Sequence, residues 1–217
     1  MKRIVFVVLA FVLVSGMVQA QDMRFGAKAG LTLGNSNFDD VTLEGGPKLD
    51  KKMRLSFVFG GMMHMPMGDN IVLIGEAAYM QKGVKYQGDG TYEGIDYDAE
   101  YIMKMSYLEI DALFKYLATE SLGLYGGLGF GLLLSAENEY DFTIDFSPPV
   151  NESGSIDIKD QCKSTEISLN FGAQFLATEN ILLDARYNLG LTNIFDEEYD
   201  PDEIKSRTMS LTVGYLF

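Results

Sequence analysis

The sequence has little of the chemistry on which many exported domains and enzymes depend. It contains one cysteine (Cys162), one histidine (His64), no tryptophan and five prolines. A single cysteine cannot form an internal disulfide, so other interactions have to stabilise the fold. We interpret Cys162 as an unpaired loop thiol rather than a nucleophile. No group of histidines, cysteines and aspartates has the spacing of a zinc site, and we expect neither a metal nor a cofactor.

Positive charge is also scarce. The chain has 17 lysines and arginines against 31 aspartates and glutamates, which gives a formal net charge of −14 at pH 7. A chain of this charge repels a phosphate backbone, so the composition excludes nucleic acid as a partner.

Only one long hydrophobic run is present, and it lies at the N-terminus. Lys2 and Arg3 precede the apolar run Ile4–Val14, and small residues follow at Val18-Gln19-Ala20. This pattern is typical of a cleaved secretory signal, and the run is shorter than the about 20 residues that a membrane-spanning helix needs. We therefore predict a signal peptide at residues 1–20 and one mature domain at residues 21–217.

The mature chain alternates between apolar and polar residues, as strands with one apolar face do. In the last segment Met209, Leu211, Val213 and Tyr215 share one face, and the threonines, a serine and a glycine share the other. The same reading predicts eight strands: Arg24–Gly34, Met53–Met65, Ile71–Lys82, Met103–Tyr116, Leu122–Leu134, Glu166–Phe175, Ile181–Thr192 and Ser206–Phe217. The second is the weakest, because apolar residues fall on both of its faces.

The links between these strands are short and long in strict alternation. The short links are 66–70, 118–121 and 178–180, and the long links are 35–52, 83–102, 135–163 and 193–205. An up-and-down barrel places alternate links at opposite ends, and outer-membrane barrels have short periplasmic turns and long outer loops. The sequence therefore predicts an all-β fold, an eight-stranded antiparallel transmembrane β-barrel in the cell outer membrane, with the lipid bilayer as its first partner.

In such a barrel the apolar faces contact lipid and the polar faces point inward. The polar faces carry charges of both signs: Lys28, Arg54, Glu76, Glu109, Asp111, Lys115, Asp184 and Arg186. Tyrosines suited to an aromatic girdle lie on the apolar faces: Tyr79, Tyr116, Tyr187 and Tyr215. The inward charges either line an ion path or form a salt-bridged plug. We favour the plug, because eight strands enclose only enough space for their own side chains.

Several segments together resemble the PorT-like family of outer-membrane β-barrels, which is widespread in Bacteroidota. They are Phe25–Leu31, Glu76–Tyr79 with Lys82-Gly83, Tyr107–Ile110 continuing to Leu113–Tyr116, and the terminal Gly214–Phe217. Ala112 departs from the family pattern, which usually has proline there. The C-terminal Phe217 is similar to the signal that the barrel-assembly machinery recognises. Most members of the family look like small barrels without an assigned role, and a few belong to a protein-secretion apparatus.

His64 is the strongest candidate for catalysis. It would act as a general base of a surface hydrolase, with Ser56 or an inward carboxylate as its partner. No nucleophile motif surrounds it, and a catalytic base requires a positioned partner. We therefore prefer a structural or interfacial histidine and assign no catalytic, cofactor-binding or metal-binding residue.

The long links are rich in acids. One link holds Asp89, Glu93, Asp96, Asp98 and Glu100, a second opens with Glu137, Glu139, Asp141 and Asp145, and the last holds Asp196, Glu197, Glu198, Asp200, Asp202 and Glu203. Such clusters bind calcium weakly in some proteins, but no EF-hand or calcium repeat is present, and a solvated charge run is the commoner explanation. Tyr92, Tyr97, Tyr101 and Tyr140 lie among the acids and suit contact with a surface glycan or protein.

The sequence therefore predicts a non-enzymatic outer-membrane barrel with a plugged polar lumen and long acidic outer loops, acting in surface interaction or envelope integrity. Two alternatives stay open. The chain is a component of a secretion or transport complex, as the resemblance permits, or it is a lipid-modifying enzyme that uses His64.

Overall fold

The fold was analysed in a computed structural model, which describes residues 23–37, 41–42, 48–92, 94–145, 149–196 and 203–217. The predicted signal peptide at residues 1–20 lies outside the described residues. The strands are β1 (Arg24–Ser36), β2 (Val41–Thr42), β3 (Lys48–Pro66), β4 (Ile71–Tyr92), β5 (Ile95–Leu117), β6 (Leu122–Ile144), β7 (Val150–Asp157), β8 (Thr165–Leu176), β9 (Ile181–Gly190) and β10 (Ser206–Leu216). One 3-10 turn, η2 (Lys159–Gln161), is present in the described part of the chain, and it follows β7. None of the helical turns in the described ranges is long and apolar enough to cross a bilayer.

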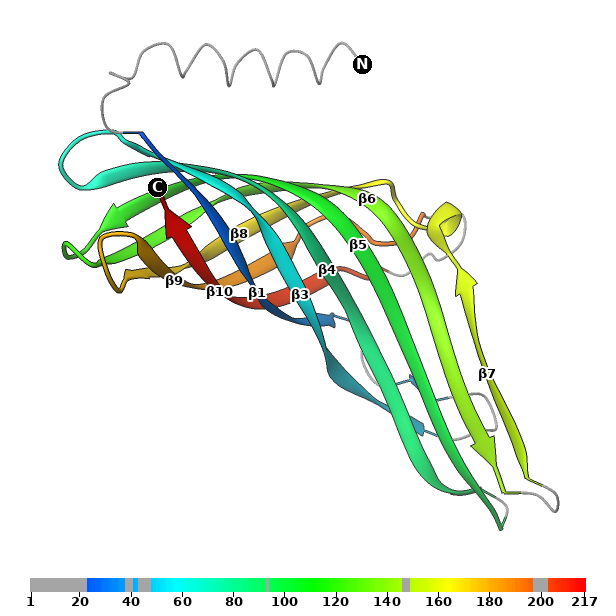
Figure 1. Ribbon diagram of the computed structural model, residues 1–217. Coiled ribbons are helices and arrows are strands. Elements are labelled where there is room, and N and C mark those ends of the chain that lie inside the picture. The colour runs from blue at the N-terminus through cyan, green and yellow to red at the C-terminus, as the bar shows by residue number, and fades with distance from the viewer. Residues whose placement is uncertain (1–22, 38–40, 43–47, 93, 146–148, 197–202) are drawn as a thin grey trace.

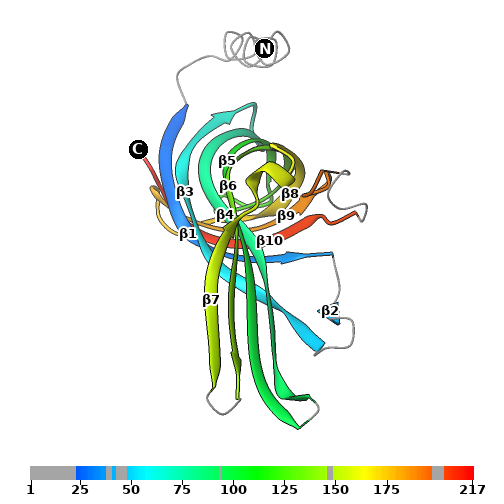
Figure 2. The same ribbon diagram turned by 90° about the vertical axis from the view of Figure 1, so that its right-hand side faces the viewer.

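Eight of these strands form a closed antiparallel barrel. The order around the ring is β1, β3, β4, β5, β6, β8, β9 and β10, and β1 pairs with both β3 and β10, which closes the sheet. Viewed nearly along its axis, the barrel is a ring, while β2 and β7 lie outside it (Figure 2). Because closure pairs both edges, the ring has no open sheet edge. The predicted eight-stranded barrel is confirmed.

Side-chain polarity is inverted relative to a soluble barrel. Leu211, Leu31 and Phe114 are 67%, 56% and 60% exposed on the outer face. The inner face instead buries polar side chains such as Thr32, Asn170 and Glu109, each at most 1% exposed. An apolar outer band around a polar interior is the arrangement of a β-barrel in lipid.

One end of the barrel, which we call the short-turn end, carries the short links 66–70, 118–121 and 178–180 (Figure 1). Strand β1 begins at this end, and strand β10 ends there. The opposite end, the long-hairpin end, carries the remaining connections.

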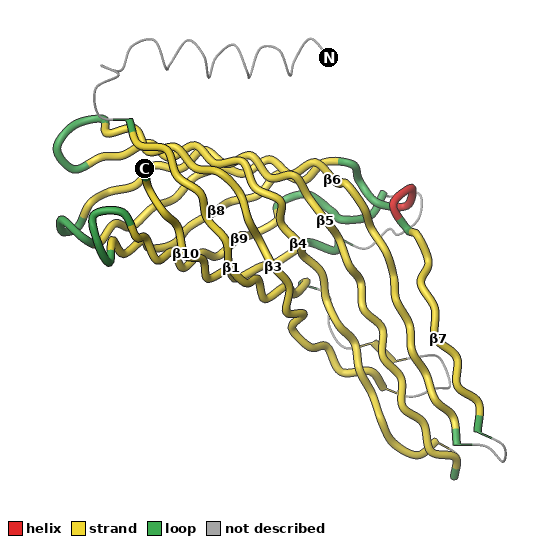
Figure 3. The backbone as a smooth tube through the Cα atoms, viewed as in Figure 1, coloured by secondary structure: helices red, strands yellow, loops and turns green. Residues whose placement is uncertain are grey.

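Two of the predicted long loops are wrong, because they are mostly strand. β4 and β5 continue past the barrel as one hairpin with paired residues from Ile71↔Tyr116 to Tyr92↔Ile95. β6 likewise continues to Ile144 and turns into β7. The tube in Figure 3 shows these strands running well beyond the ring. The charges of 83–102 and 135–163 favour solvated loops, but alternation with tyrosine, phenylalanine and isoleucine, which is typical of strands, persists through both segments.

The irregular pattern of 53–65 also has an explanation. Val58 and Met62 of β3 point into the barrel rather than away from it. Val58 packs with Ala78 and Met80, and Met62 packs with Leu182 and Leu216. The lumen therefore contains apolar as well as polar layers, which the assumption of a wholly polar inner face did not include.

Candidate functional site

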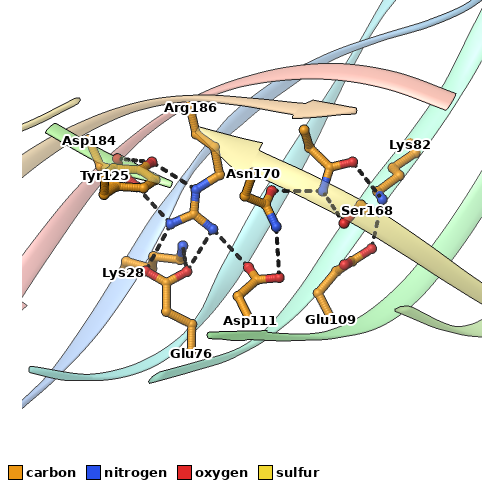
Figure 4. A network of polar contacts seen from close by, with 11 residues as sticks. Lys28, Glu76, Lys82, Glu109, Asp111, Tyr125, Ser168, Asn170, Asp184 and Arg186 are labelled. Carbon is orange, nitrogen blue, oxygen red and sulfur yellow. Dashed lines mark hydrogen bonds and ion pairs between the residues drawn. The ribbon is translucent and has the colours of Figure 1, made fainter. Parts of the chain in front are cut away.

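Arg186 of β9 is the centre of a buried polar network inside the barrel (Figure 4). Its Nη1 lies 2.7 Å from Glu76 Oε2 and 2.8 Å from Asp111 Oδ2. Its Nη2 donates to Glu76 Oε1 at 2.9 Å and lies 3.3 Å from Asp184 Oδ2. Lys28 of β1 adds a second cation, 2.5 Å from Glu76 Oε2. A buried charge has a high desolvation cost unless it is paired and hydrogen-bonded, and the planar guanidinium supplies several donors to these carboxylates at once.

Lys82 of β4 organises a second group nearer the long-hairpin end. Its Nζ lies 2.8 Å from Glu109 Oε1 and 2.6 Å from Glu166 Oε1, and it donates to Asn188 Oδ1 at 3.1 Å. Amide and hydroxyl groups join this group to the first one: Asn188 donates to Ser168 and Asn170, and Asn170 donates to Asp111. The two groups, with charges from β1, β4, β5, β8 and β9, thus form one connected network.

Most of the inward charges predicted from the sequence take part in this network. Lys28, Glu76, Glu109, Asp111, Asp184 and Arg186 do so, all at most 6% exposed. Arg54 is half-buried and donates to the Lys82 carbonyl at 3.1 Å. Lys115 is buried but forms no ion pair within the described ranges; it donates instead to Gln174 Oε1 at 3.1 Å.

Tyr125 of β6 is a part of the network that the sequence reading missed. Its hydroxyl donates to Asp184 Oδ1 at 2.6 Å and accepts from Arg186 Nε at 2.9 Å. The signal for Tyr125 in the sequence is its place in the alternation of β6, because it shares the inner face of this strand with Gly123, Gly129 and Gly131. These glycines leave room for the charges: a Cβ at Gly129 would lie 2.5 Å from both Asp111 Oδ1 and Ser168 Oγ.

An apolar cluster, which we call the lid, covers the network at the long-hairpin end. It joins Tyr107 and Leu133 of the barrel wall, and Met105 and Ala136 where β5 and β6 leave that wall, to residues of two connections: Ile158, Cys162, Ile194 and Ile204. Backbone hydrogen bonds hold the two connections together, from Lys163 N to Ile194 O at 2.8 Å and from Asp196 N to Gln161 O at 3.0 Å. The Tyr107 ring faces Lys82, with Nζ 5.1 Å from the ring centroid, so the lid lies directly on the Lys82 group. The sequence reading missed the lid, because its loop residues are single apolar positions in polar segments.

Cys162 is a member of the lid. It is free and 5% exposed, and burial raises the pKa of its thiol to about 11. A thiol reacts as the thiolate, so a raised pKa opposes nucleophilic chemistry at neutral pH.

His64 lies on β3 near the short-turn end and is 5% exposed. Ser56, its suggested partner, is eight residues away on the same strand, which at about 3.3 Å per residue is about 26 Å. Within the described part of the chain His64 Nε2 has no hydrogen-bond partner. The structure therefore does not bring His64 and Ser56 together as a catalytic pair.

Beyond the ring, β4 to β7 form a four-stranded antiparallel sheet of residues 84–92, 95–105, 136–144 and 150–157, which we call the hairpin sheet (Figures 1 and 2). The register separates its side chains into two faces. The face continuous with the barrel interior is mostly aromatic and apolar, although Asn138 and Glu152 also lie on it. Its aromatic and apolar members are Val84, Tyr86, Tyr97, Tyr101, Met103, Tyr140, Phe142, Ile144 and Ile156. The face continuous with the barrel exterior is mostly acidic: Lys85, Asp89, Asp96, Asp98, Glu100, Lys104, Glu137, Glu139, Asp141 and Asp157.

The two lysines of the acidic face pair with neighbouring acids, Lys85 with Glu100 at 2.6 Å and Lys104 with Glu139. The remaining carboxylates leave this face negative. No group of three histidine, cysteine, aspartate or glutamate side chains is arranged to hold a metal in the ranges that the structure describes. Of the acids singled out in the sequence, Glu93, Glu197, Glu198, Asp200 and Asp202 lie outside those ranges.

The tyrosines expected to form a girdle all lie on the outer face. Tyr116 and Tyr215 are 57% and 52% exposed near the short-turn end. Tyr79 stacks on Phe59 with ring centroids 5.3 Å apart, and Tyr187 lies 5.2 Å from Phe171. Phe217 is 72% exposed, and its backbone N–H donates to Phe25 O at 2.8 Å.

Comparisons with known proteins find similar solved structures and one family model. The solved structures include the attachment invasion locus protein Ail of Yersinia pestis, with 20% identity over 91% of this chain and 100% of that chain and a TM-score of 0.45. The outer membrane protein OprG of Pseudomonas aeruginosa has 16% identity over 89% of this chain and 95% of that chain, with a TM-score of 0.38. CarO of Acinetobacter baumannii has 12% identity over 88% and 97%, with a TM-score of 0.41. These likenesses concern the fold alone. No curated protein sequence matches the chain.

The family model of the outer membrane protein beta-barrel domain matches residues 19–196. That range includes seven of the eight strands of the ring together with the hairpin sheet. The chain is therefore an outer-membrane protein, and it belongs to the family of outer membrane protein beta-barrel domains.

Proposed function

We propose that this protein is a non-enzymatic outer-membrane barrel with a closed lumen, which uses the hairpin sheet to bind a protein or glycan at the cell surface. Short turns are periplasmic in outer-membrane barrels, so the short-turn end faces the periplasm and the hairpin sheet faces the outside. The single observation that carries the proposal is the change of polarity along the same strands. Where β4, β5 and β6 leave the apolar band, their outer face becomes acidic and their inner face becomes aromatic.

Neither closure of the ring nor contact with lipid explains this change of polarity. The ring closes below the hairpin sheet, and lipid contact ends with the apolar band. Tyrosine and phenylalanine on a half-buried face give large contact area with few rotatable bonds, which favours recognition. A negative face on the other side favours and orients a positively charged partner.

The buried network and the lid support the closed lumen. An eight-stranded ring has room only for its own side chains. Here the side chains from opposite walls contact one another, since Arg186 of β9 pairs with Glu76 of β4 and Asp111 of β5. We expect the purified protein in planar lipid bilayers to show no sustained conductance, with an open porin recorded beside it as the positive control. Steady channels of uniform size would contradict the closed lumen.

The binding role is tested with the protein in nanodiscs on an array of basic proteins and of neutral and charged glycans. In the test variant, Asp89, Asp96, Asp98 and Asp141 of the acidic face are changed to asparagine. We expect the wild-type protein to bind at least one class of ligand, and the variant to bind it at least tenfold more weakly, because the long-range attraction is lost.

The matched control changes Asp160, Asp196 and Glu203 of the other connections to their amides. These residues are outside the hairpin sheet, so the control should bind as the wild type does. An equal loss of binding in both variants would indicate that the net charge of the protein, rather than the hairpin sheet, determines binding. If the wild-type protein binds no class of ligand on the array, the surface role is contradicted.

We also propose that the chain is PorT-like. The segments that carry this resemblance meet in the lumen. Lys28 from the first segment pairs with Glu76 of the second, and Lys82 pairs with Glu109 of the third. Segments that are far apart in the sequence therefore supply one buried network. This shared network is a physical reason for the same sequence to contain all of them.

Two further assignments belong to the same proposal. Residues 1–20 act as the export signal and leave a single domain at 21–217. Phe217, exposed beside Tyr215 with ring centroids 5.7 Å apart, acts as the recognition residue for the barrel-assembly machinery.

A further inference from the structure

A cavity of about 170 Å³ lies in the barrel mouth at the short-turn end, which is the periplasmic mouth in the proposed orientation. Its wall includes Arg24, His64, Lys115, Gln174, Glu120 and Ser121 together with apolar residues. At about 30 Å³ per water molecule in the liquid, this is the space of five or six waters, enough for a tetrahedral group of five heavy atoms. The lid and the Arg186 network lie above it, so the cavity is separate from the surface that binds in the proposed function.

Lys115 makes this cavity different from the rest of the lumen. The side chains of Lys28, Lys82 and Arg186 lie within ion-pair distance of carboxylates. Lys115 is 7% exposed and, within the described ranges, has no carboxylate at that distance. Its hydrogen-bond acceptor is the neutral amide oxygen of Gln174. Asp184 and Glu76 act on this ammonium only from beyond ion-pair distance. A buried ammonium without a carboxylate in contact is costly, so an anion in the cavity would be stabilised.

Two side chains of the same cavity wall carry buried polar atoms without partners. His64 Nε2 and Gln174 Nε2 have no hydrogen-bond partner among the described residues, and the two side chains are 5% and 2% exposed. The Gln174 amide nitrogen is a donor, and the imidazole donates from Nε2 in one of its neutral tautomers. Buried polar atoms without partners are uncommon, and a ligand is one of the explanations for them.

Arg24 supplies a further cation at the rim. Its Nη2 donates to the backbone oxygen of Glu179 at 2.7 Å, which fixes the guanidinium and leaves other N–H groups available. Glu120 is the opposing charge of the cavity wall, but it is exposed in the turn at 118–121, where water screens it. The balance at the buried part of the wall is positive.

We infer that the periplasmic mouth is an oxyanion site for a phosphate group, held by Lys115, Arg24 and the side-chain donors of His64 and Gln174. The phosphate belongs either to a free anion from the periplasm or to the headgroup of a phospholipid from the inner leaflet. The chemistry of recognition is the same in both cases, and the test separates the sources.

The first arm uses the mature protein in a maltoside detergent, which contains no phosphate. Inorganic phosphate is titrated and followed by calorimetry and by the NMR shifts of the Gln174 side-chain amide. The second arm uses nanodiscs of phosphatidylethanolamine, followed by exchange into the same detergent and a phosphorus assay of retained lipid. In the arm that detects the ligand, Lys115→Gln and Arg24→Gln should each weaken binding at least tenfold, and Glu120→Gln should tighten it severalfold.

Lys159→Gln is the matched control, because Lys159 is exposed at the opposite end of the barrel and should leave binding unchanged. The gel shift between boiled and unboiled samples verifies that each variant is folded. Binding of inorganic phosphate supports a free anion, and retention of about one phospholipid per barrel supports the headgroup. Binding in neither arm, or binding that Lys115→Gln and Arg24→Gln leave unchanged, overturns the inference.

Discussion

Replacing Arg186 with leucine is expected to destabilise the folded barrel by about 3–5 kcal/mol, as breaking a buried ion pair from one side typically does. The guanidinium contacts Glu76, Asp111 and Asp184, which are at most 4% exposed. Without it, Lys28 is the remaining cation in contact with this group of carboxylates among the described residues, and its ion pair there is with Glu76. The loss is measured from urea unfolding in lipid vesicles, followed by far-UV circular dichroism because the chain has no tryptophan.

Two variants show whether the carboxylates cause the loss. Arg207→Leu changes an arginine that is only half-buried, on the same hairpin, and should alter the unfolding free energy by less than about 0.5 kcal/mol, as surface changes usually do. Adding Glu76→Gln and Asp111→Asn to Arg186→Leu should recover part of the stability, because an unpaired amide costs less than an unpaired carboxylate. If Arg186→Leu loses no more than Arg207→Leu, the network does not stabilise the barrel.

The features that could be predicted from the sequence are those that depend on neighbouring residues along the chain. Alternation with a period of two placed every strand of the ring, and the order of short and long links identified the ends. The charges at Lys28, Glu76, Glu109 and Asp111 were expected to face inward because each lies on the polar side of its own strand. These predictions need no knowledge of which strands become neighbours.

The features that were missed depend on contacts between distant parts of the chain. Ile158 and Ile204 look like ordinary loop residues until their connections meet over Tyr107 and Leu133. Tyr125 was missed because its role depends on hydrogen bonds of its hydroxyl with Asp184 and Arg186, which are about 60 residues away in the sequence. No pattern of neighbouring residues in the sequence predicts that these groups will be in contact.

The hairpin sheet was mispredicted for a different reason. Dense charge predicts an irregular loop, but a strand outside the membrane has one face in water and tolerates aspartate and glutamate there. The aromatic residues on alternate positions, such as Tyr97, Tyr101 and Tyr140, are the signal of continued strand. That signal lies in the face that these tyrosines share and not in any one of them.

The inverted polarity of the wall leads to the second large effect. Leu211 lies at the centre of β10 and is 67% exposed on the outer face, opposite Leu31 of β1 and Ala185 of β9. Leu211→Arg should destabilise the barrel in vesicles by about 2–4 kcal/mol, because arginine at the bilayer midplane loses its hydration. In a soluble protein the same change at a well-exposed position would have little effect.

The matched control is Ile156→Arg in β7. Ile156 is also an aliphatic strand residue, 54% exposed, but it lies in the hairpin sheet beyond the apolar band. Arginine there stays in water, so the unfolding free energy should change by less than about 0.5 kcal/mol. The difference between the two variants measures the lipid contribution directly, since both exchange an exposed aliphatic side chain for the same cation. Equal effects would mean that Leu211 does not face acyl chains, and the position of the bilayer around the ring would have to be assigned differently.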